Sequence, residues 1–282
     1  MRHYSPLRYP GGKGKIANYF KTIFELNNLI DGVYVEPYAG GASIALSLLF
    51  SGYASKVIVN DINISIFAFW SSVLNNTEEL SKLIRDTPVT IKTWEHLREI
   101  QNSKREFDLL ELGFSTFFLN RSNRSGILDA GVIGGRNQSG KWKIDARFNK
   151  GELINRIEQI ALYRDRIEVY NFDAIELIRR LKNTLPSKTL FYMDPPYYLK
   201  GRDLYLNYYD KADHVAVAKE IKKIVNQTWV VTYDRIPFIQ RLYRNYPQLE
   251  YTLNYSASKA HKGNELMVFS NNISIPNLQL QS

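Results

Sequence analysis

The stretch TLFYMDPPY, residues 189–197, says more about fold and chemistry than any other part of this 282-residue chain. Its first five residues form a short apolar run bounded by a loop signal, which is typical of a buried strand. Pro195 and Pro196 end the strand, because neither can donate a backbone N–H to a sheet. Ligands bind at the carboxyl ends of strands in open α/β sheets. Asp194, the free carbonyls and the Tyr197 ring therefore suit a flat base with an exocyclic amine, and a rigid turn closing a strand is the alternative.

Apolar runs alternate with helical segments over much of the chain. Further strands are expected at residues 33–35, 56–60, 167–170 and 228–233, and helices at 44–50 and from Asp173 to 181. Strands spaced by helices predict parallel βαβ units. Residues 249–255 and 265–270 are expected to form an antiparallel pair. The fold class expected is therefore α/β, with a doubly wound, mostly parallel sheet and a closing antiparallel hairpin.

The alternation of strands and helices stops between Asp61 and Ile167. Residues 77–111 are predicted to be largely helical, whereas residues 120–150 are rich in Gly, Asn, Ser and Arg. Because a structureless loop of this length is unusual in a compact domain, we expect an inserted domain at 77–165, between the two segments 1–76 and 166–282 of the main domain. A solvated surface excursion is the alternative. Asp129 and Asp145 are the only acids at 120–150, against seven basic residues, a balance of +5: Arg121, Arg124, Arg136, Lys141, Lys143, Arg147 and Lys150.

Charge and composition restrict the class of protein. The net charge is +9 and 44% of the residues are hydrophobic, which is typical of a basic globular protein. Such a charge favours an anionic partner, and nucleic acid is the first candidate. The chain has no cysteine, which excludes disulfides and thiolate metal sites. No run reaches the ~18 apolar residues of a membrane span, so we expect a cytoplasmic protein without a membrane partner.

Two glycine-containing segments precede the insert. Residues 36–43 join a strand to a helix, and Gly40 lets a ligand approach the backbone. The dinucleotide and Walker fingerprints are both absent. Asp61, at the end of the next strand, is placed to accept hydrogen bonds from ribose hydroxyls, so a nucleoside-containing cofactor is expected; a tight turn is the alternative. The segment from Tyr9 to Lys13 can hold a carboxylate or a phosphate, although terminal lysines are usually solvated.

Together these motifs resemble the Dam-type DNA adenine-N6 methyltransferases, in the family's order and over nearly the whole chain. The parts that carry the resemblance are PLRYPGGKGK (6–15), YVEPYAGGAS (34–43), VNDIN (59–63) and FYMDPPYY (191–198). The basic segment resembles the family's recognition domain in FLNRSNRSGIL (118–128) and GGRNQSGKWKIDARFNKG (134–151). One departure is Ala42, because the family often has a second glycine in a G-x-G arrangement.

The resemblance implies a Rossmann-like methyltransferase fold with a mainly helical target-recognition insert. It implies site-specific transfer of a methyl group from S-adenosyl-L-methionine to N6 of a flipped-out adenine in double-stranded DNA, without a metal. Lys13 would face the methionine carboxylate of the donor and Asp61 its ribose, and Asp173 would meet its adenine edge. The full donor-binding set implied is Tyr9, Lys13, Tyr38, Gly40, Asp61, Asp173 and Asp194.

The chemistry of the amine supports the same assignment. Adenine N6 is a poor nucleophile, because its lone pair is delocalised into the ring. Hydrogen bonds from N6 to Asp194 and to the Pro195 carbonyl would free that lone pair, so orientation is the main task. Flipping the base costs a few kcal/mol, and stacking on Tyr197 returns roughly 1–3 kcal/mol. The catalytic set is therefore Asp194, Pro195, Pro196 and Tyr197. The expected DNA contacts, with Arg124 as base reader, are Arg121, Asn123, Arg124, Arg136, Lys141 and Lys143.

Rival functions remain at the level of sequence. A methyltransferase of another amine, in an RNA base, at cytosine N4 or in a protein glutamine, is the enzymatic rival. Related sites for cytosine commonly begin with Ser and those for glutamine with Asn, so Asp194 favours adenine. A DNA-binding protein that has lost catalysis is the other rival, and the intact DPPY and EPYAGG segments count against it. The sequence leaves open whether a cognate restriction endonuclease is a partner.

Overall fold

The computed structural model describes residues 4–8, 13–198, 209–255 and 261–277. The chain folds into two compact units. Unit 1 comprises Met1–Gly12 and Ile62–Asn171, and unit 2 comprises Lys13–Asp61 and Phe172–Ser282. Among the described residues, no helix has the length and apolar character needed to cross a membrane.

Unit 2 consists of strands with helices between them. Its elements are η1 (Lys13–Ile16), α1 (Ala17–Leu26), β1 (Gly32–Glu36), α2 (Ser43–Phe50), β2 (Ala54–Asn60), α8 (Ala174–Leu181), β4 (Thr189–Met193), α10 (Lys211–Ile221), β5 (Thr228–Asp234), α11 (Pro237–Leu242), β6 (Gln248–Tyr255) and β7 (His261–Phe269).

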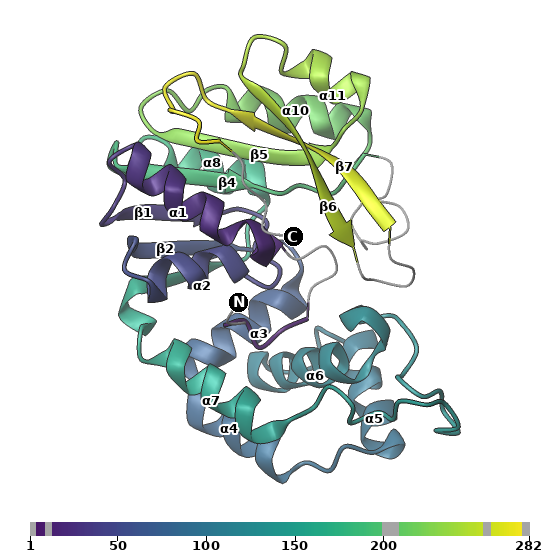
Figure 1. The fold of residues 1–282 in the computed structure, drawn as a ribbon. Helices are drawn as coiled ribbons and strands as arrows, with labels where there is room; N and C mark the ends of the chain where they lie inside the picture. Colours follow the sequence, from purple (N-terminus) through teal and green to yellow (C-terminus); the bar gives the residue numbers. More distant parts are fainter. Residues whose placement is uncertain (1–3, 9–12, 199–208, 256–260, 278–282) are drawn as a thin grey trace. The chain divides into compact units, whose positions relative to one another are not determined.

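The strands form a mixed seven-stranded sheet in the order β3-β2-β1-β4-β5-β7-β6, where β3 is Ile167–Tyr170. Strand β1 pairs in parallel with β2 and β4, and β4 pairs in parallel with β5. Strand β7 runs antiparallel to both β5 and β6. The predicted strands, their mainly parallel pairing and the closing antiparallel pair are therefore confirmed. Helices α1 and α2 pack together on one face of the sheet, and α8 and α10 on the other (Figure 1).

The sheet has a switch point between β1 and β4. The chain leaves β1 towards β2 through α2, and β4 lies on the opposite side of β1. Val35 and Phe191, near the carboxyl ends of β1 and β4, are register partners. The loops that follow these two strands therefore leave the same edge of the sheet on neighbouring strands, which is where open α/β sheets bind ligands.

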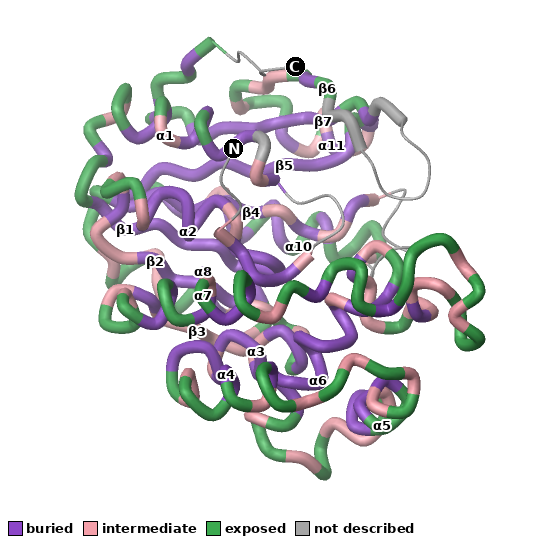
Figure 2. Tube along the Cα trace, turned by 60° about the horizontal axis from the view of Figure 1, so that its bottom comes forward, coloured by how far each residue is buried: buried purple, intermediate pink, exposed green. Residues whose placement is uncertain are grey.

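The core of unit 2 is made by the central strands. Every residue of β1, β4 and β5 is buried, and these strands run as continuous buried segments in Figure 2. Tyr34, Phe191 and Trp229 are among the largest fully buried side chains. Strands covered on both faces read as unbroken apolar runs, which explains why this part of the sheet could be predicted from sequence.

Unit 1 is mainly helical. Its helices are α3 (Ile64–Asn75), α4 (Thr77–Asp86), α5 (Ile91–Asn102), α6 (Leu109–Ser122), η2 (Arg124–Gly126), α7 (Lys150–Ala161) and η3 (Arg164–Arg166). Helix α6 packs against α3 and α5. The approach to α3 is close, since a Cβ added to Gly113 would lie 2.6 Å from the Ala68 carbonyl oxygen. The rings of Phe69 and Phe117 stack across the same contact, with centroids 6.0 Å apart.

The helical part of unit 1 differs in extent from the sequence expectation. Helix α6 continues beyond residue 111 to Ser122, because its residues 112–120 are all buried and hold it in the core. It begins with a capping box, in which the Asp108 side chain accepts from the Glu111 amide and Glu111 accepts from the Asp108 amide. The predicted insert boundaries of 77 and 165 stay a prediction; the compact unit itself also contains α3 and β3.

Candidate active site

The carboxylate of Asp194 lies directly after β4. Thr232, on the neighbouring strand β5, donates its hydroxyl to Asp194 Oδ1 at 2.6 Å. Lys13 Nζ lies 3.6 Å from the same oxygen. The Asp194 side chain keeps 23% of its surface exposed, whereas Lys13 keeps 5%. One carboxylate oxygen is thus held in place by the protein, and the residue is still accessible.

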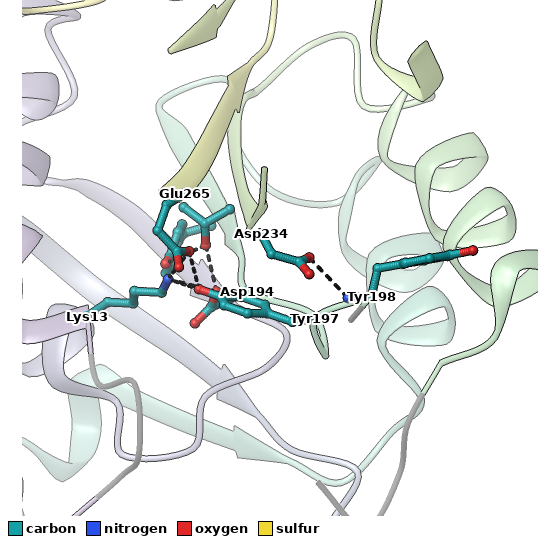
Figure 3. A network of polar contacts seen from close by, with 8 residues as sticks. Lys13, Asp194, Tyr197, Tyr198, Asp234 and Glu265 are labelled. Carbon is teal, nitrogen blue, oxygen red and sulfur yellow. Dashed lines mark hydrogen bonds and ion pairs between the residues drawn. The ribbon is translucent and has the colours of Figure 1, made fainter. Parts of the chain in front are cut away.

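Tyr197 is held through its hydroxyl. This hydroxyl accepts a hydrogen bond from Lys13 Nζ and donates one to Glu265 Oε2 on β7. Lys13 and Glu265 also form an ion pair, with Nζ and Oε2 3.3 Å apart. Figure 3 shows these side chains converging beside Asp194, and we call the set Lys13, Asp194, Tyr197 and Glu265 the acceptor cluster.

In the acceptor cluster, burial and neighbouring charges have opposite effects on the pKa values of Asp194 and Lys13. Burial raises the pKa of Asp194 above its ordinary value, and the Lys13 charge and the Thr232 hydrogen bond offset part of that rise. Burial alone would lower the pKa of Lys13, but the negative charge of Asp194, together with Glu265, raises it well above its ordinary value. The lysine therefore stays a cation between two carboxyl groups.

The peptide after the two prolines is fixed to the next strand. The Tyr198 amide donates to Asp234 Oδ1 at 3.1 Å, at the end of β5. Pro195 is buried and Pro196 is half-buried. Beyond them, the Tyr198 ring packs against His214 and Phe238, with centroids 5.4 and 5.2 Å away. The DPPY segment is therefore a rigid turn that also presents a carboxylate.

The glycine turn after β1 is closed by the carboxylate at the end of β2. The Gly40 amide donates to Asp61 Oδ2 at 3.0 Å. Gly40 and Ala42 both have left-handed backbones, with φ of 46° and 47°. The left-handed conformation costs a non-glycine residue roughly 1–2 kcal/mol. Ala42 therefore occupies, with some strain, the position where the resembling family often has glycine, and α2 begins at the next residue.

Asn60 joins this turn to the loop after β3. Its Nδ2 donates to the carbonyls of Pro37 and Phe172, at 2.9 and 3.0 Å, and its Oδ1 accepts from the Phe172 amide at 2.8 Å. Asp173, the next residue, is exposed and caps α8 by accepting from the amides of Ile175 and Glu176. Its carboxylate is therefore used at least in part for helix capping.

Glu36 is buried and Tyr38 is half-buried on the β1 side of the site. The Tyr38 and Tyr209 hydroxyls lie 3.2 Å apart, and burial raises the pKa of Tyr38 well above its ordinary value. Glu36 accepts from the Tyr34 hydroxyl at 2.8 Å. Burial raises the pKa of Glu36 to about 8, although that hydrogen bond and one from the Ala45 amide act against the rise. Glu36 is therefore largely protonated at neutral pH.

Two of the residues expected to contact DNA instead make hydrogen bonds within unit 1. Asn123 is fully buried; its Oδ1 accepts from Trp94 Nε1 at 2.6 Å and its Nδ2 donates to the carbonyls of Ile127 and Leu128. The half-buried Arg121 donates to the Arg147 carbonyl at 2.8 Å, and burial lowers its pKa to about 10. The sequence could not show this, because polar residues in a basic segment look alike whether they face inwards or outwards.

The other four expected DNA contacts are exposed on the same unit. The guanidinium of Arg136 lies 5.9 Å from the Trp94 ring centroid, and Lys143 donates to the Gln138 carbonyl at 2.5 Å. Lys141 lies beside Trp142, which is 63% exposed. The Arg124 amide donates to the Gly131 carbonyl, within a turn that contains the left-handed Ser125. The exposed four are Arg124, Arg136, Lys141 and Lys143.

The structure brings the expected site residues together in two groups within unit 2. Lys13, Asp194 and Tyr197 meet in the acceptor cluster, and Gly40 and Asp61 meet in the glycine turn. Tyr9 lies outside the described residues. Glu265 was not foreseen, because it lies 252 residues from Lys13 in the chain and no local motif surrounds it. Among the described residues, no group of three or more His, Cys, Asp or Glu side chains is arranged to hold a metal.

The sequence of this chain matches a known protein family and is similar to a named relative. The profile of the D12 class N6 adenine-specific DNA methyltransferases matches residues 9–257. The Type II methyltransferase M.MjaIII of Methanocaldococcus jannaschii is 24% identical over 237 residues, covering 77% of this chain and 79% of that protein.

Two solved structures resemble the chain at low similarity. A SAM-dependent methyltransferase from Agrobacterium tumefaciens has 9% identity and a TM-score of 0.44, with 90% of this chain and 61% of that chain covered. TrmK of M. capricolum, in complex with S-adenosyl-homocysteine, has 8% identity and a TM-score of 0.38, with coverages of 92% and 71%.

Proposed function

The chain belongs to the D12 class N6 adenine-specific DNA methyltransferases, and we propose that it methylates a flipped-out adenine with Asp194 as the residue that orients N6. The observation that carries this proposal is the placement of Asp194. It follows a central strand at the switch point of the sheet, with Oδ1 held by Thr232 and part of the side chain exposed. A fixed, accessible carboxylate at this edge suits an amine that has to be oriented before it attacks.

Asp194 has two tasks in this proposal. It accepts a hydrogen bond from N6, with the Pro195 carbonyl as second acceptor, and so releases the nitrogen lone pair from the ring. When the N6–CH₃ bond forms, N6 has to lose a proton, and a carboxyl group whose pKa is raised by burial is a suitable acceptor for it. The charge of Lys13 lowers the pKa of Asp194 and so favours its ionised form.

We assign the methyl donor, S-adenosyl-L-methionine, to the glycine turn. When bound, it supplies a methyl group activated by a sulfonium centre. The residues present fit a nucleoside. Asp61, which follows β2, is half-exposed, and its Oδ2 accepts a hydrogen bond from the Gly40 amide. The same carboxylate can accept further hydrogen bonds from the hydroxyl groups of a ribose. Asp173 stands on the loop that Asn60 joins to this turn.

Lys13 receives a different role from the one expected from sequence. We propose that it belongs to the acceptor side, because its ammonium contacts Tyr197, Glu265 and Asp194, which are all acceptor-cluster residues. The donor's carboxylate would have to compete with two carboxylates that are already in contact with this cation.

DNA recognition is assigned to unit 1. Its exposed basic residues, above all Arg136, Lys141 and Lys143, suit phosphate contacts, and Arg124 on its turn suits a base edge. Asn123 is better assigned to holding that turn, given its burial and three hydrogen bonds. A restriction endonuclease as partner and a cytoplasmic location stay predictions; the relative from Methanocaldococcus jannaschii is a Type II methyltransferase.

Changing Asp194 to Ala tests the central assignment. We expect single-turnover methyl transfer to fall by about 100-fold or more, because an orienting and proton-accepting group is removed. The affinity for S-adenosyl-L-methionine, measured by titration calorimetry, should stay within about threefold, since the lost contact belongs to the acceptor. Transfer at a rate close to wild type would refute the role of Asp194, and an equal loss of donor affinity would place Asp194 on the donor side.

A further inference from the structure

The Tyr197 ring is fixed by partners on two distant segments. Its hydroxyl accepts from Lys13, at the start of η1, and donates to Glu265 on β7. The ammonium of Lys13 also lies 4.9 Å from the centroid of the same ring. Tyr197 keeps only 7% of its surface exposed, so the ring is held by packing and by both ends of a short hydrogen-bonded chain.

Burying the carboxyl group of Glu265 in its charged form costs free energy. It is 1% exposed, and a buried charge has to be paired to be tolerated. Lys13 supplies the pairing, with Nζ and Oε2 3.3 Å apart. A buried ion pair is nevertheless weak evidence for stability, because well-packed apolar residues of similar volume often serve as well or better. A pair that gains little in stability can serve to fix one geometry instead.

The same lysine also contacts Asp194, with Nζ 3.6 Å from Oδ1. Lys13 therefore contacts both the first and the last residue of the DPPY motif, Asp194 and Tyr197, and Glu265 in turn contacts Lys13 (Figure 3). Within the acceptor cluster, one cation faces two carboxyl groups. Removing Glu265 would leave the Tyr197 hydroxyl with Lys13 as its remaining partner in the cluster, and would let the lysine shift towards Asp194.

We propose that Glu265 is a positioning residue for methyl transfer, which fixes the ring of Tyr197 for stacking on the target base by accepting the hydrogen bond of its hydroxyl. The proposal rests on the function proposed above, because the ring has to stack on a flipped base. Stacking on an aromatic ring stabilises a flipped base, and a ring that is already oriented loses no side-chain entropy when the base stacks on it. Glu265 touches neither the base nor the donor; it acts through Tyr197.

The test is a double-mutant cycle of Glu265→Gln and Tyr197→Phe, read by single-turnover methyl transfer. Each single variant should lower the rate about 10-fold or more, because a loosely held ring misplaces the base. The double variant should be no slower than Tyr197→Phe, since Glu265 acts through the hydroxyl that Phe lacks. Donor affinity should stay within twofold of wild type in all three. Glu250→Gln is the matched control at an exposed position on the adjacent strand β6, and it should keep the wild-type rate.

The outcomes separate the inference from the function beneath it. Rates that multiply in the double variant would show that Glu265 merely neutralises Lys13, and a wild-type rate in either single variant would also overturn the proposal. If Glu265→Gln fails to fold, Tyr197→Phe still decides, because that variant leaves the Lys13–Glu265 pair in place. If the wild-type protein methylates no adenine in DNA, the proposed function and the role of Glu265 are both refuted. If the wild type is active and Glu265→Gln and Tyr197→Phe transfer methyl groups at its rate, only the role of Glu265 is refuted.

Discussion

Single side chains in unit 2 set the charge at the carboxyl ends of β1 and β4. Glu36 ends β1, Asp194 follows β4 and Glu265 reaches Asp194's neighbour Lys13 from β7. These three carboxyl groups are buried or half-buried, and they differ in what offsets the cost of burial. Lys13 compensates two of them directly. Glu36 is hydrogen-bonded by the Tyr34 hydroxyl instead, and the neighbouring charge of Asp194 helps to raise its pKa. One site therefore holds a carboxyl group in contact with a cation and another that is largely protonated at neutral pH.

Glu36 gives a prediction about stability and pH. Its pKa rises from 4.5 to about 8 on folding, so between these values the folded state binds more protons than the unfolded state. The stability of the wild-type protein should then fall as the pH rises through this window, by up to ~1.4 kcal/mol per pH unit from this group. Glu36→Gln stays neutral and keeps an acceptor for Tyr34, so the fall should be smaller in this variant.

Urea unfolding of wild type and Glu36→Gln between pH 5 and pH 8 measures this difference. The variant should gain stability relative to wild type as the pH rises. Glu250→Gln, the same change at an exposed position, should follow the wild-type profile. Parallel curves for wild type and Glu36→Gln would mean that Glu36 is ionised in the folded protein throughout this range.

At the scale of elements, the glycine turn and the end of β2 form one structural piece. Asp61 closes the turn through the Gly40 amide, and Asn60 joins it to the Phe172 loop. The strained backbone of Ala42 is held by this arrangement, with its amide donating to the Ala39 carbonyl at 2.7 Å. The turn is therefore held by hydrogen bonds within the chain itself.

Asp61→Ala should weaken the binding of S-adenosyl-L-methionine by about 10-fold or more, since hydrogen bonds to a charged group contribute about 1.5–3 kcal/mol. Single-turnover transfer at saturating donor should fall much less, because Asp61 is not assigned to the acceptor. Titration calorimetry and rapid-quench kinetics give the two quantities. Asp165→Ala, an exposed aspartate of η3 in unit 1, is the control. Unchanged donor affinity in Asp61→Ala would remove Asp61 from the donor site.

The elements divide into those that the sequence predicts and those that it does not. The strands of the sheet were predictable because buried strands are short apolar runs, and DPPY marks where one of them has to end. The C-terminal end of α6 could not be predicted, because its last residues, up to Ser122, run without a break into a polar segment that resembles a loop. Local pattern likewise placed Asp194 and Tyr197 but missed Glu265, because only the pairing of β5 with β7 brings it to the site. The inward orientation of Asn123 also depends on packing that no spacing reveals.

At the scale of the whole molecule, the net charge is +9, but not all basic residues are exposed to a binding partner. Arg121 is half-buried and bound to backbone carbonyls, whereas Lys141 and Lys143 are exposed. Counterion release predicts that each phosphate contact adds about 0.9 to the slope of affinity against salt on logarithmic axes. Only the exposed basic residues of unit 1 should contribute to this slope.

Changing Lys141 and Lys143 together to Ala should reduce that slope by about 2 and weaken all DNA sites alike. Arg124→Ala should instead relax discrimination at one base pair of the target. Binding titrations at several salt concentrations, with cognate and singly altered duplexes, distinguish these effects. Lys219→Ala, at an exposed position on α10 of unit 2, should change neither quantity. Wild-type slope and site preference in both unit 1 variants would place the DNA-binding surface elsewhere.

The identity of the methylated base tests the proposed role of Asp194 most directly. Purified wild-type protein would be incubated with duplex DNA and isotopically labelled S-adenosyl-L-methionine, and the DNA digested to nucleosides and separated by mass spectrometry. We expect label in N6-methyladenine for wild type, since the chain belongs to the N6 adenine-specific family. For Asp194→Ala we expect labelling at least about 100-fold slower, because we propose that Asp194 orients N6. Label in N4-methylcytosine, or N6-methyladenine formed at the wild-type rate by Asp194→Ala, would contradict this role.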